Sequence, residues 1–192
     1  MKKLALILFA TLLGGTALAQ SKIRQVEGKW ELAEDGKVAF RETYQFPDKT
    51  PEELFLATQR FITNSFGTRT SIDEADPGRG YLRKRDSFNP LLSKEPFFGK
   101  YKTISVPYDL IFEIDKDRVR VSLVLLSYEE KHSPVNTRFE ETQSYDPALQ
   151  YPVNENAFPK RYFLQIFYKT YRRTMDLMEV YRNYISLPSN AT

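Results

Sequence analysis

Alternation of apolar and polar residues predicts three strands. From Val38 to Phe46 the apolar side chains fall mostly at even positions with polar residues between them, the period of a strand with one buried face. The same period recurs from Tyr108 to Ile114 and, after a turn at 115–117, from Val119 to Leu125. We expect the last two segments to form a β-hairpin. Residues 123–126 are apolar on both faces and should be covered on both.

A weaker pair of strands is predicted at 70–75 and 81–88. Between them lies Asp76-Pro77-Gly78-Arg79-Gly80, whose residues favour a tight reversal. We therefore expect a second hairpin here.

Two further segments lack a sustained period. From Asn89 to Ser105, two prolines and Gly99 indicate an irregular excursion anchored by the pair Phe97-Phe98. From Glu129 to Pro159, four prolines and scattered charges indicate a long loop, interrupted by a short strand around 137–143.

Two helices are predicted. Thr50-Pro51-Glu52-Glu53 provides an N-cap hydroxyl, proline at the first helical position and an acid that reaches back to the cap. Apolar residues then follow helical spacing to Phe66, and Gly67 ends the helix. A second helix runs from Lys160 to about Leu187 without Gly or Pro, and its apolar stripe is Phe163, Phe167, Tyr171, Thr174, Met178, Tyr181 and Ile185.

The N-terminal residues have the pattern of a secretory signal peptide. Lys2 and Lys3 precede the apolar run 4–13, and Ala17-Leu18-Ala19 places small residues at a cleavage site. We expect cleavage after Ala19, so that the mature protein is periplasmic or secreted. The run is too short for a membrane-spanning helix, which needs about 20 residues, so no transmembrane segment is expected in the mature chain.

The remaining chain is expected to fold as a single domain. Residues 1–19 are the predicted signal peptide, 20–36 a lead-in that docks Trp30, 37–187 the domain and 188–192 a tail. The full sequence has 14 Phe, 12 Tyr and no cysteine, and of these aromatic residues only Phe9 lies in the predicted signal peptide, so aromatic packing rather than disulfides must stabilise the domain. Removing residues 1–19 leaves 26 basic and 25 acidic residues, a net charge of +1, because two of the 28 basic residues lie there. Such a chain has no general attraction to polyanions.

The predicted order of strand, helix, four strands and helix is that of an α+β protein with an antiparallel sheet packed by two helices. It is the topology of TATA-binding-protein-like folds, and a helix-grip fold has a similar order. The chain resembles the bacterial family called domain of unknown function 4468. The segments that carry the resemblance are the strand 40–46, Thr50-Pro51-Glu52-Glu53-Leu54, the helix end at 61–66, Ile72 with Gly80-Tyr81-Leu82, and 108–113 running into 118–121. The resemblance implies a TATA-binding-protein-like fold and a Gram-negative envelope setting, and it implies no activity and no catalytic residues.

A basic cluster follows the second predicted turn and consists of Arg79, Arg83, Lys84 and Arg85. Acidic residues occupy the partner strand and turn of the same predicted hairpin: Asp73, Glu74 and Asp76. Opposite charges across a sheet are favourable neighbours, so we expect these groups to pair with one another. The acids also lack the ligand spacing of a calcium loop. We predict neither nucleic-acid binding nor a metal site.

No catalytic constellation is evident. The single histidine, His132, lies in the predicted loop, and the chain has no nucleophile elbow, zinc-binding spacing or glycine-rich phosphate loop. The pairs Glu129-Glu130 and Glu140-Glu141 are sequence neighbours whose side chains point apart on a strand. We predict no enzyme activity and no cofactor.

The C-terminal helix has a wider apolar arc than one sheet contact requires. Either the sheet and the 129–159 loop bury it on two sides, or it closes a cavity for an apolar ligand. The side chains that would face such a ligand are Tyr162, Tyr168, Tyr171, Met175, Met178 and Tyr181. The outer face carries basic residues that could approach anionic headgroups: Lys169, Arg172, Arg173 and Arg182.

These patterns lead to two functional hypotheses. The first is an exported, non-catalytic binding module of the cell envelope that acts on another envelope protein or surface component. The alternative is a carrier or sensor of an apolar small molecule held between the sheet and the C-terminal helix. The partner, the ligand and the oligomeric state are not encoded in the pattern.

Overall fold

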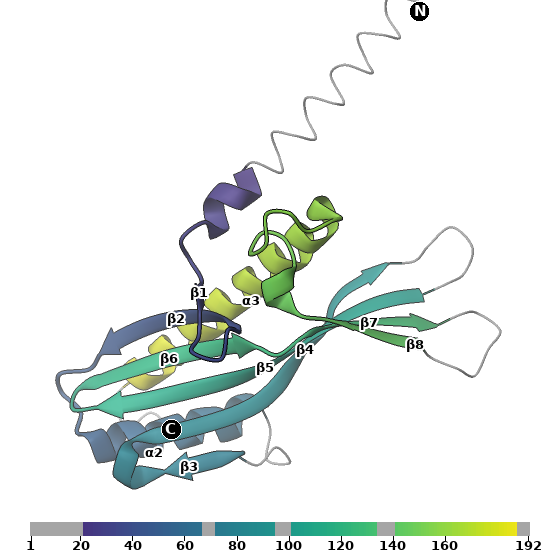
Figure 1. Ribbon diagram of the computed structural model, residues 1–192. Coiled ribbons are helices and arrows are strands. Elements are labelled where there is room, and N and C mark those ends of the chain that lie inside the picture. Colours follow the sequence, from purple (N-terminus) through teal and green to yellow (C-terminus); the bar gives the residue numbers. More distant parts are fainter. Residues whose placement is uncertain (1–20, 67–71, 95–100, 134–140, 188–192) are drawn as a thin grey trace, which may run out of the picture.

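The computed structural model describes residues 21–66, 72–94, 101–133 and 141–187 (Figure 1). The predicted signal peptide and the predicted tail lie outside these residues. Within them, eight strands form one antiparallel sheet, and both long helices cover the same face of it. The α+β class predicted from the sequence is confirmed.

The main path through the sheet has the strand order β1-β2-β6-β5-β4-β3, and β7 and β8 extend it beside β5. The helices and strands, in chain order, are β1 (Glu31–Leu32), β2 (Val38–Gln45), α2 (Pro51–Phe66), β3 (Glu74–Asp76), β4 (Tyr81–Lys94), β5 (Tyr101–Asp115), β6 (Arg118–Leu125), β7 (Tyr128–Ser133), β8 (Glu141–Tyr145) and α3 (Lys160–Ser186). Residues 21–26 form a further helical segment before β1. The predicted strands at 38–46, 108–114 and 119–125 and both long helices are confirmed.

The start of α2 is a reciprocal cap. The backbone N–H of Thr50 donates to Glu53 Oε2 at 2.8 Å, and the N–H of Glu53 donates to Thr50 Oγ1 at 3.2 Å. Two donors that the first turn leaves without helical partners are thus satisfied. The hydrogen bond from the Thr50 backbone lowers the pKa of Glu53.

The core lies between the helices and the sheet. Phe61 of α2 is fully buried, and its ring meets Tyr181 of α3 edge to face, with ring centres 5.1 Å apart. Thr58 donates its hydroxyl to the carbonyl oxygen of Leu54 at 2.7 Å and lies 2.9 Å from the hydroxyl of Tyr181. Both buried hydroxyls therefore have partners, as burial of polar groups requires. Desolvation raises the pKa of Tyr181.

The predicted irregular excursion at 89–105 is wrong for its described residues, 89–94 and 101–105. Strand β4 continues to Lys94 and β5 begins at Tyr101, and a register shift between Phe88 and Leu92 accommodates Pro90. A proline lacks the N–H of a regular ladder, and a bulge lets the strand resume after it. Phe97 and Phe98 lie outside the described residues.

The predicted loop at 129–159 is also wrong in its first half. Strands β7 and β8 form a hairpin, and β7 pairs with the start of β5. His132, predicted to lie in a loop, is a β7 residue whose backbone is paired with Lys102 and Glu141. The predicted short strand at 137–143 overlaps β8 only at 141–143, and 134–140 lie outside the described residues.

The lead-in docks as predicted. Trp30 packs edge to face on Phe167 of α3, with ring centres 6.2 Å apart. Beyond that prediction, β1 adds a short strand to β2. The chain before the domain is thereby fixed to both the sheet and the last helix.

Candidate functional site

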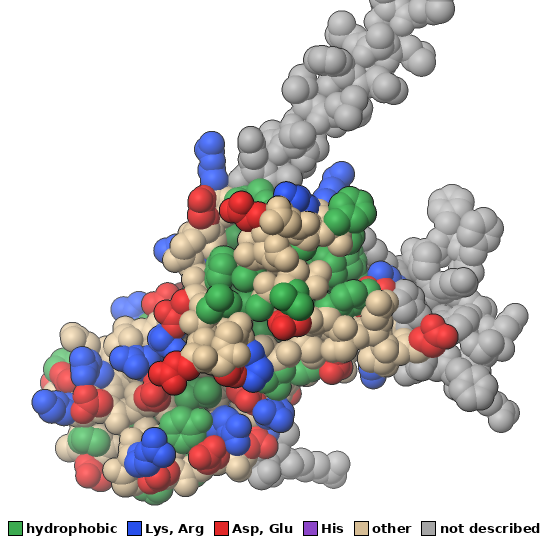
Figure 2. All heavy atoms as spheres, in the orientation of Figure 1, with side chains coloured by type: hydrophobic (Ala, Val, Ile, Leu, Met, Phe, Trp, Pro, Cys, Tyr) green, Lys and Arg blue, Asp and Glu red, His purple; other side chains and the backbone are tan. Residues whose placement is uncertain are grey.

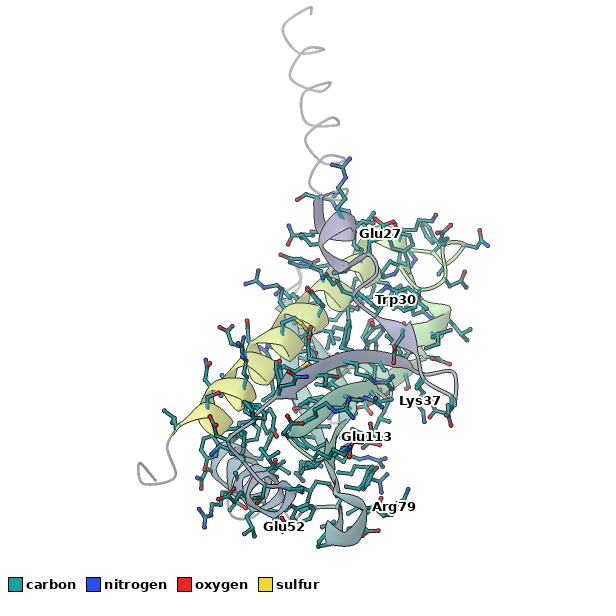
Figure 3. All side chains as sticks on the ribbon, turned by 90° about the vertical axis from the view of Figure 1, so that its left-hand side faces the viewer. Glu27, Trp30, Lys37, Glu52, Arg79 and Glu113 are labelled. Atoms are coloured by element: carbon teal, nitrogen blue, oxygen red, sulfur yellow. The ribbon has the colours of Figure 1, made fainter. Side chains whose placement is uncertain are left out.

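The face of the sheet opposite the helices is the candidate site, and we call it the open sheet face. Figure 2 shows basic and acidic side chains interspersed over this side of the molecule, and Figure 3 shows Lys37, Glu113 and Arg79 on the side away from α3. A hollow of about 800 Å³ lies on it, bordered at one edge by residues 31–37. Neither long helix covers this face, and charged side chains such as Arg120 and Glu113 are about half exposed on it, whereas Ala39 and Ser122 are buried.

Strand register arranges the open sheet face in three rows. The first row crosses the sheet as Arg85, Asp109, Val124, Ala39 and Glu31. The second is Glu74, Arg83, Ile111, Ser122 and Arg41. The third is Asp76, Tyr81, Glu113, Arg120 and Thr43. Directly opposed residues on one face are close neighbours, so register alone decides which charges meet.

Asp109 organises the arginines of β4. Arg85 donates to both of its carboxylate oxygens, from Nε at 2.8 Å and from a terminal nitrogen at 2.9 Å. Arg83 lies 3.8 Å from Asp109 and forms a closer ion pair with Glu74 at 3.1 Å. The carboxylate of Asp109 is only 11% exposed. A bidentate contact fixes the plane of a guanidinium as well as its position, so Arg85 is held in one orientation. The hydrogen bonds that Arg85 donates to Asp109 raise the pKa of Arg85.

The other side of the open sheet face has looser pairs. Arg120 faces Glu113 at 3.5 Å, and both side chains are about half exposed. Arg41 donates from Nε to the hydroxyl of Ser122 at 3.0 Å and forms an ion pair with Glu31 of β1. Exposed pairs of this kind contribute little to stability, so their arrangement is not required by the fold.

The hollow on this face is balanced in charge and has an apolar floor. Its basic lining residues are Lys37, Arg41, Arg83, Arg85 and Arg120, and its acidic ones are Glu31, Glu34, Asp35, Asp109 and Glu113. Ile111 and Val124 lie among them, with Tyr81 at one side. The rim thus contains four arginines and one tyrosine around an apolar centre, and Arg and Tyr are enriched at protein interfaces.

The basic cluster predicted from the sequence pairs only in part with the acids expected of it, because the side chain of Arg85 pairs with Asp109 instead. Arg83 pairs with Glu74, and Lys84 lies 3.4 Å from Asp73. Asp73 also accepts a hydrogen bond from the backbone N–H of Arg85, which lowers the pKa of Asp73. Asp76 caps the turn instead of pairing with a side chain, because it accepts the backbone N–H of Arg79. The cluster is therefore not an uncompensated basic patch.

The structure separates the six residues proposed to face a ligand. Met178 and Tyr181 are fully buried and pack in the core, and Tyr171 packs on Phe40 with ring centres 5.8 Å apart. Tyr168 donates to the side-chain oxygen of Gln25 at 2.9 Å. Tyr162 and Met175 are partly buried against the core. The open sheet face and two smaller hollows are lined by other residues, so these six do not converge on any of the three.

A buried charged group joins β7 to the last helix. Glu130 is 3% exposed, forms an ion pair with Lys102 and accepts a hydrogen bond from the hydroxyl of Tyr162 at 2.5 Å. The Lys102 ammonium also lies 4.5 Å from the centre of the Tyr162 ring. Desolvation, followed by the hydrogen bond to Glu130, raises the pKa of Tyr162. These contacts connect β5, β7 and α3, and a stabilising role accounts for them.

The described residues contain neither a metal-binding cluster nor a helix that could span a membrane. In the described part of the chain, no three His, Asp or Glu residues gather closely enough to hold a metal ion. Among the same residues, no helix has the length and apolar character to span a bilayer.

Sequence reasoning missed the residues that build the open sheet face. Arg41, Asp109, Glu113 and Arg120 all occupy the polar positions of alternating strands, so their outward direction was visible. Their mutual pairing was not, because it depends on the register of strands far apart in the sequence.

The fold defines the class of protein: an α+β chain of the TATA-binding-protein-like type. No protein-family model matches the sequence. No curated protein matches it either. Two solved structures are similar in fold.

One is a TBP-like protein from Parabacteroides distasonis ATCC 8503, with TM-score 0.55 and 14% identity over 80% of this chain and 95% of that one. The other is a DUF4468 family protein from Bacteroides ovatus ATCC 8483, with TM-score 0.57 and 13% identity over 86% of this chain and 95% of that one. At these identities the likeness is one of fold, and it confirms the fold implied by the resemblance found in the sequence.

Proposed function

We propose that this protein is an exported, non-catalytic interaction module of the bacterial envelope and that it binds another envelope protein through the open sheet face. The observation that carries the proposal is the uncovered hollow with its charge-balanced rim and apolar floor. The signal-peptide pattern of residues 1–19 supports the location.

The charge pattern favours a protein over a polyanion. Nucleic acids bind where Lys and Arg side chains are available to neutralise successive phosphates. Here Arg83 and Arg85 already contact carboxylates, and the basic and acidic residues of the hollow are equal in number. A protein surface presents both signs of charge and can pair with the acidic and the basic residues of the hollow. Such charge complementarity contributes more to specificity than to affinity.

Preorganisation also supports this assignment. Ordering a long side chain on binding costs about 0.5–1.5 kcal/mol. Asp109 already orders Arg85 in the unbound protein, so binding of a partner causes little further loss of side-chain entropy at Arg85. The four arginines and Tyr81 that line the hollow are of residue types enriched among binding hot spots.

The carrier hypothesis receives less support. The space between sheet and α3 is occupied by packed rings, including Phe40 on Phe167 at 5.5 Å and Phe112 on Tyr181 at 4.8 Å. An apolar ligand there would have to displace core side chains.

A charge exchange tests the proposal. In Glu113→Arg/Arg120→Glu, the ion pair is kept with its direction reversed, so folding should be unchanged while a complementary partner meets the wrong charges. The tagged variant should lose the envelope protein that the native chain retains after mild washing, measured by quantitative mass spectrometry of purified complexes.

The matched control reverses charges on the exposed face of α3. Arg172→Glu/Asp176→Arg likewise changes two exposed residues of opposite charge and should retain the partner. Equal retention of the same proteins by both exchanges, with equal melting temperatures, would contradict the proposal.

A further inference from the structure

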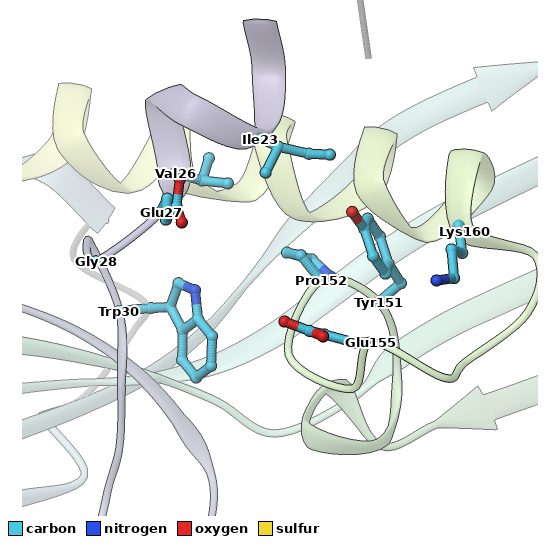
Figure 4. Close-up of a pocket in the computed structure, with 9 residues that line it drawn as sticks. All are labelled: Ile23, Val26, Glu27, Gly28, Trp30, Tyr151, Pro152, Glu155 and Lys160. Atoms are coloured by element: carbon cyan, nitrogen blue, oxygen red, sulfur yellow. The ribbon is translucent and has the colours of Figure 1, made fainter. Parts of the chain in front are cut away.

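A separate hollow of about 250 Å³ lies where the N-terminal segment meets the start of α3. Figure 4 shows Trp30 on one side of it and Tyr151 with Pro152 on the other, with Ile23 and Val26 above. It shares no lining residue with the open sheet face.

The local sequence builds the Trp30 wall. A turn follows the helical segment 21–26 and contains Gly28, whose φ of 69° is a left-handed conformation that favours glycine. The reversal there directs the chain back to Trp30, and Phe167 holds the indole from behind. One wall of the hollow is therefore fixed by the core.

The opposite wall is held by its own turns. The backbone N–H of Asn154 donates to the carbonyl oxygen of Gln150 at 2.9 Å, and its side-chain amide donates to that of Leu149 at 3.3 Å. These bonds fix the loop that carries Tyr151 and Pro152 across from Trp30. The two aromatic walls are thus preorganised in the unbound protein.

The charged groups around the hollow favour a cation. Figure 4 shows the Glu155 carboxylate extending toward Trp30 from below, and Glu27 borders the hollow above. Among the described residues, neither carboxylate forms an ion pair, so both can accept a positive charge. Aromatic faces also attract cations, and Lys160 already shows this, with its ammonium 5.3 Å from the centre of the Tyr151 ring.

We propose that this hollow binds a small organic ammonium ion with a short apolar body. The ammonium would lie between Glu27 and Glu155, with the apolar part against Trp30, Val26 and Ile23. The volume corresponds to about eight waters at roughly 30 Å³ each, so the ligand has about seven to nine non-hydrogen atoms. Choline and 2-phenylethylammonium are of this size and chemistry.

The single tryptophan makes the proposal directly testable. Trp30 is the only Trp in the chain, so its fluorescence reports on this hollow alone. We expect saturable changes in emission when purified full-length protein is titrated with choline or 2-phenylethylammonium chloride. The neutral isostere of choline, 3,3-dimethyl-1-butanol, should produce none at the same concentrations.

Charge variants fix the sign of the interaction. Glu27→Gln and Glu155→Gln keep the shape and should each weaken choline binding about fivefold, the effect of about one unit charge at contact distance in water. Lys160→Met removes a like charge and should tighten binding by a similar factor. Glu52→Gln, an exposed acid on α2, is the control and should leave binding unchanged.

Three results would overturn the proposal. One is the absence of a saturable signal up to about 10 mM of either cation, beyond the millimolar range of weak specific binding. Equal binding of the neutral alcohol would show an apolar pocket without charge selection. Weaker binding after Lys160→Met would assign the hollow to an anion. None of these results bears on the open sheet face, which shares no lining residue with this hollow.

Discussion

Replacement of Phe61 by alanine tests how the core is assembled. The side chain is fully buried, and its ring meets four others: Tyr181 at 5.1 Å, Tyr184 at 5.5 Å, and Phe66 and Phe112 at 6.4 Å each. Phe61 thus joins α2 to both α3 and the sheet.

The expected cost follows from these contacts. Burial of a large apolar side chain contributes about 1.5–3 kcal/mol, and favourable ring pairs add about 0.5–1.5 kcal/mol each. The surrounding rings belong to three different elements and cannot all move into the space, so a cavity remains. Phe→Ala in such sites costs about 3–5 kcal/mol, and we expect about 4 kcal/mol for Phe61→Ala.

Urea unfolding measures this cost. With an m-value of about 2 kcal/mol per molar, the midpoint should fall by about 2 M. Leu56→Ala, on the solvent side of the same helix at 53% exposure, is the control and should change stability by less than about 0.5 kcal/mol. An unchanged midpoint for Phe61→Ala would mean that α2 does not pack on the sheet as described, and the fold assignment would fail with it.

Four other outcomes are expected. Thr50→Ala should cost about 1 kcal/mol in urea unfolding through loss of the α2 cap, and a cost near zero would contradict the reciprocal cap. Glu130→Ala should cost about 1–3 kcal/mol because it removes the buried acceptor of the Tyr162 hydroxyl and the counter-ion of Lys102, whereas Glu129→Ala, its neighbour, should cost far less; similar costs would contradict the assignment. Because the folded pKa of Asp73 lies below its ordinary value of 3.8, the stability that it contributes is present above that value and is lost as pH falls further. The difference in urea midpoint between the native protein and Asp73→Asn should therefore shrink below about pH 4, and a difference that grows there would contradict the sign. N-terminal sequencing of the fractionated protein should begin at Gln20, and intact Met1 from soluble cytoplasm would contradict export.

The sequence predicted those helices and strands whose signals, such as a helix cap or a repeating apolar pattern, lie within one short segment. The cap of α2, the alternation of β2 and the stripe of α3 each lie within one segment, and all are observed. The failures occurred where distant pairing overrides local chemistry. Pro90 suggested a break, yet buried neighbours such as Leu92 and Ile104 hold the strands together past the bulge.

In the candidate site too, the contacts within one predicted hairpin could be predicted, whereas the contacts that depend on the pairing of other strands could not. The sequence indicated that Arg83 and Arg85 would meet acidic residues, and it identified Glu74 as one of them. It did not indicate Asp109, because that residue becomes a neighbour only through the pairing of β4 with β5. A period of two predicts which face of the sheet each side chain points to. The register, which decides which side chains become neighbours, depends on the partner strand.

The measurement that tests the central claim most directly is site-specific photocrosslinking in the native host. Thr43 is exposed and lies in the third row of the open sheet face, opposite Arg120. A photoreactive phenylalanine placed there should give one discrete adduct with an envelope protein, and Glu113→Arg/Arg120→Glu should abolish it. The same probe at Arg60, exposed on α2, should give none. An adduct from the probe at Arg60 and none from the probe at Thr43 would place the interaction on the helical side of the molecule and contradict the account.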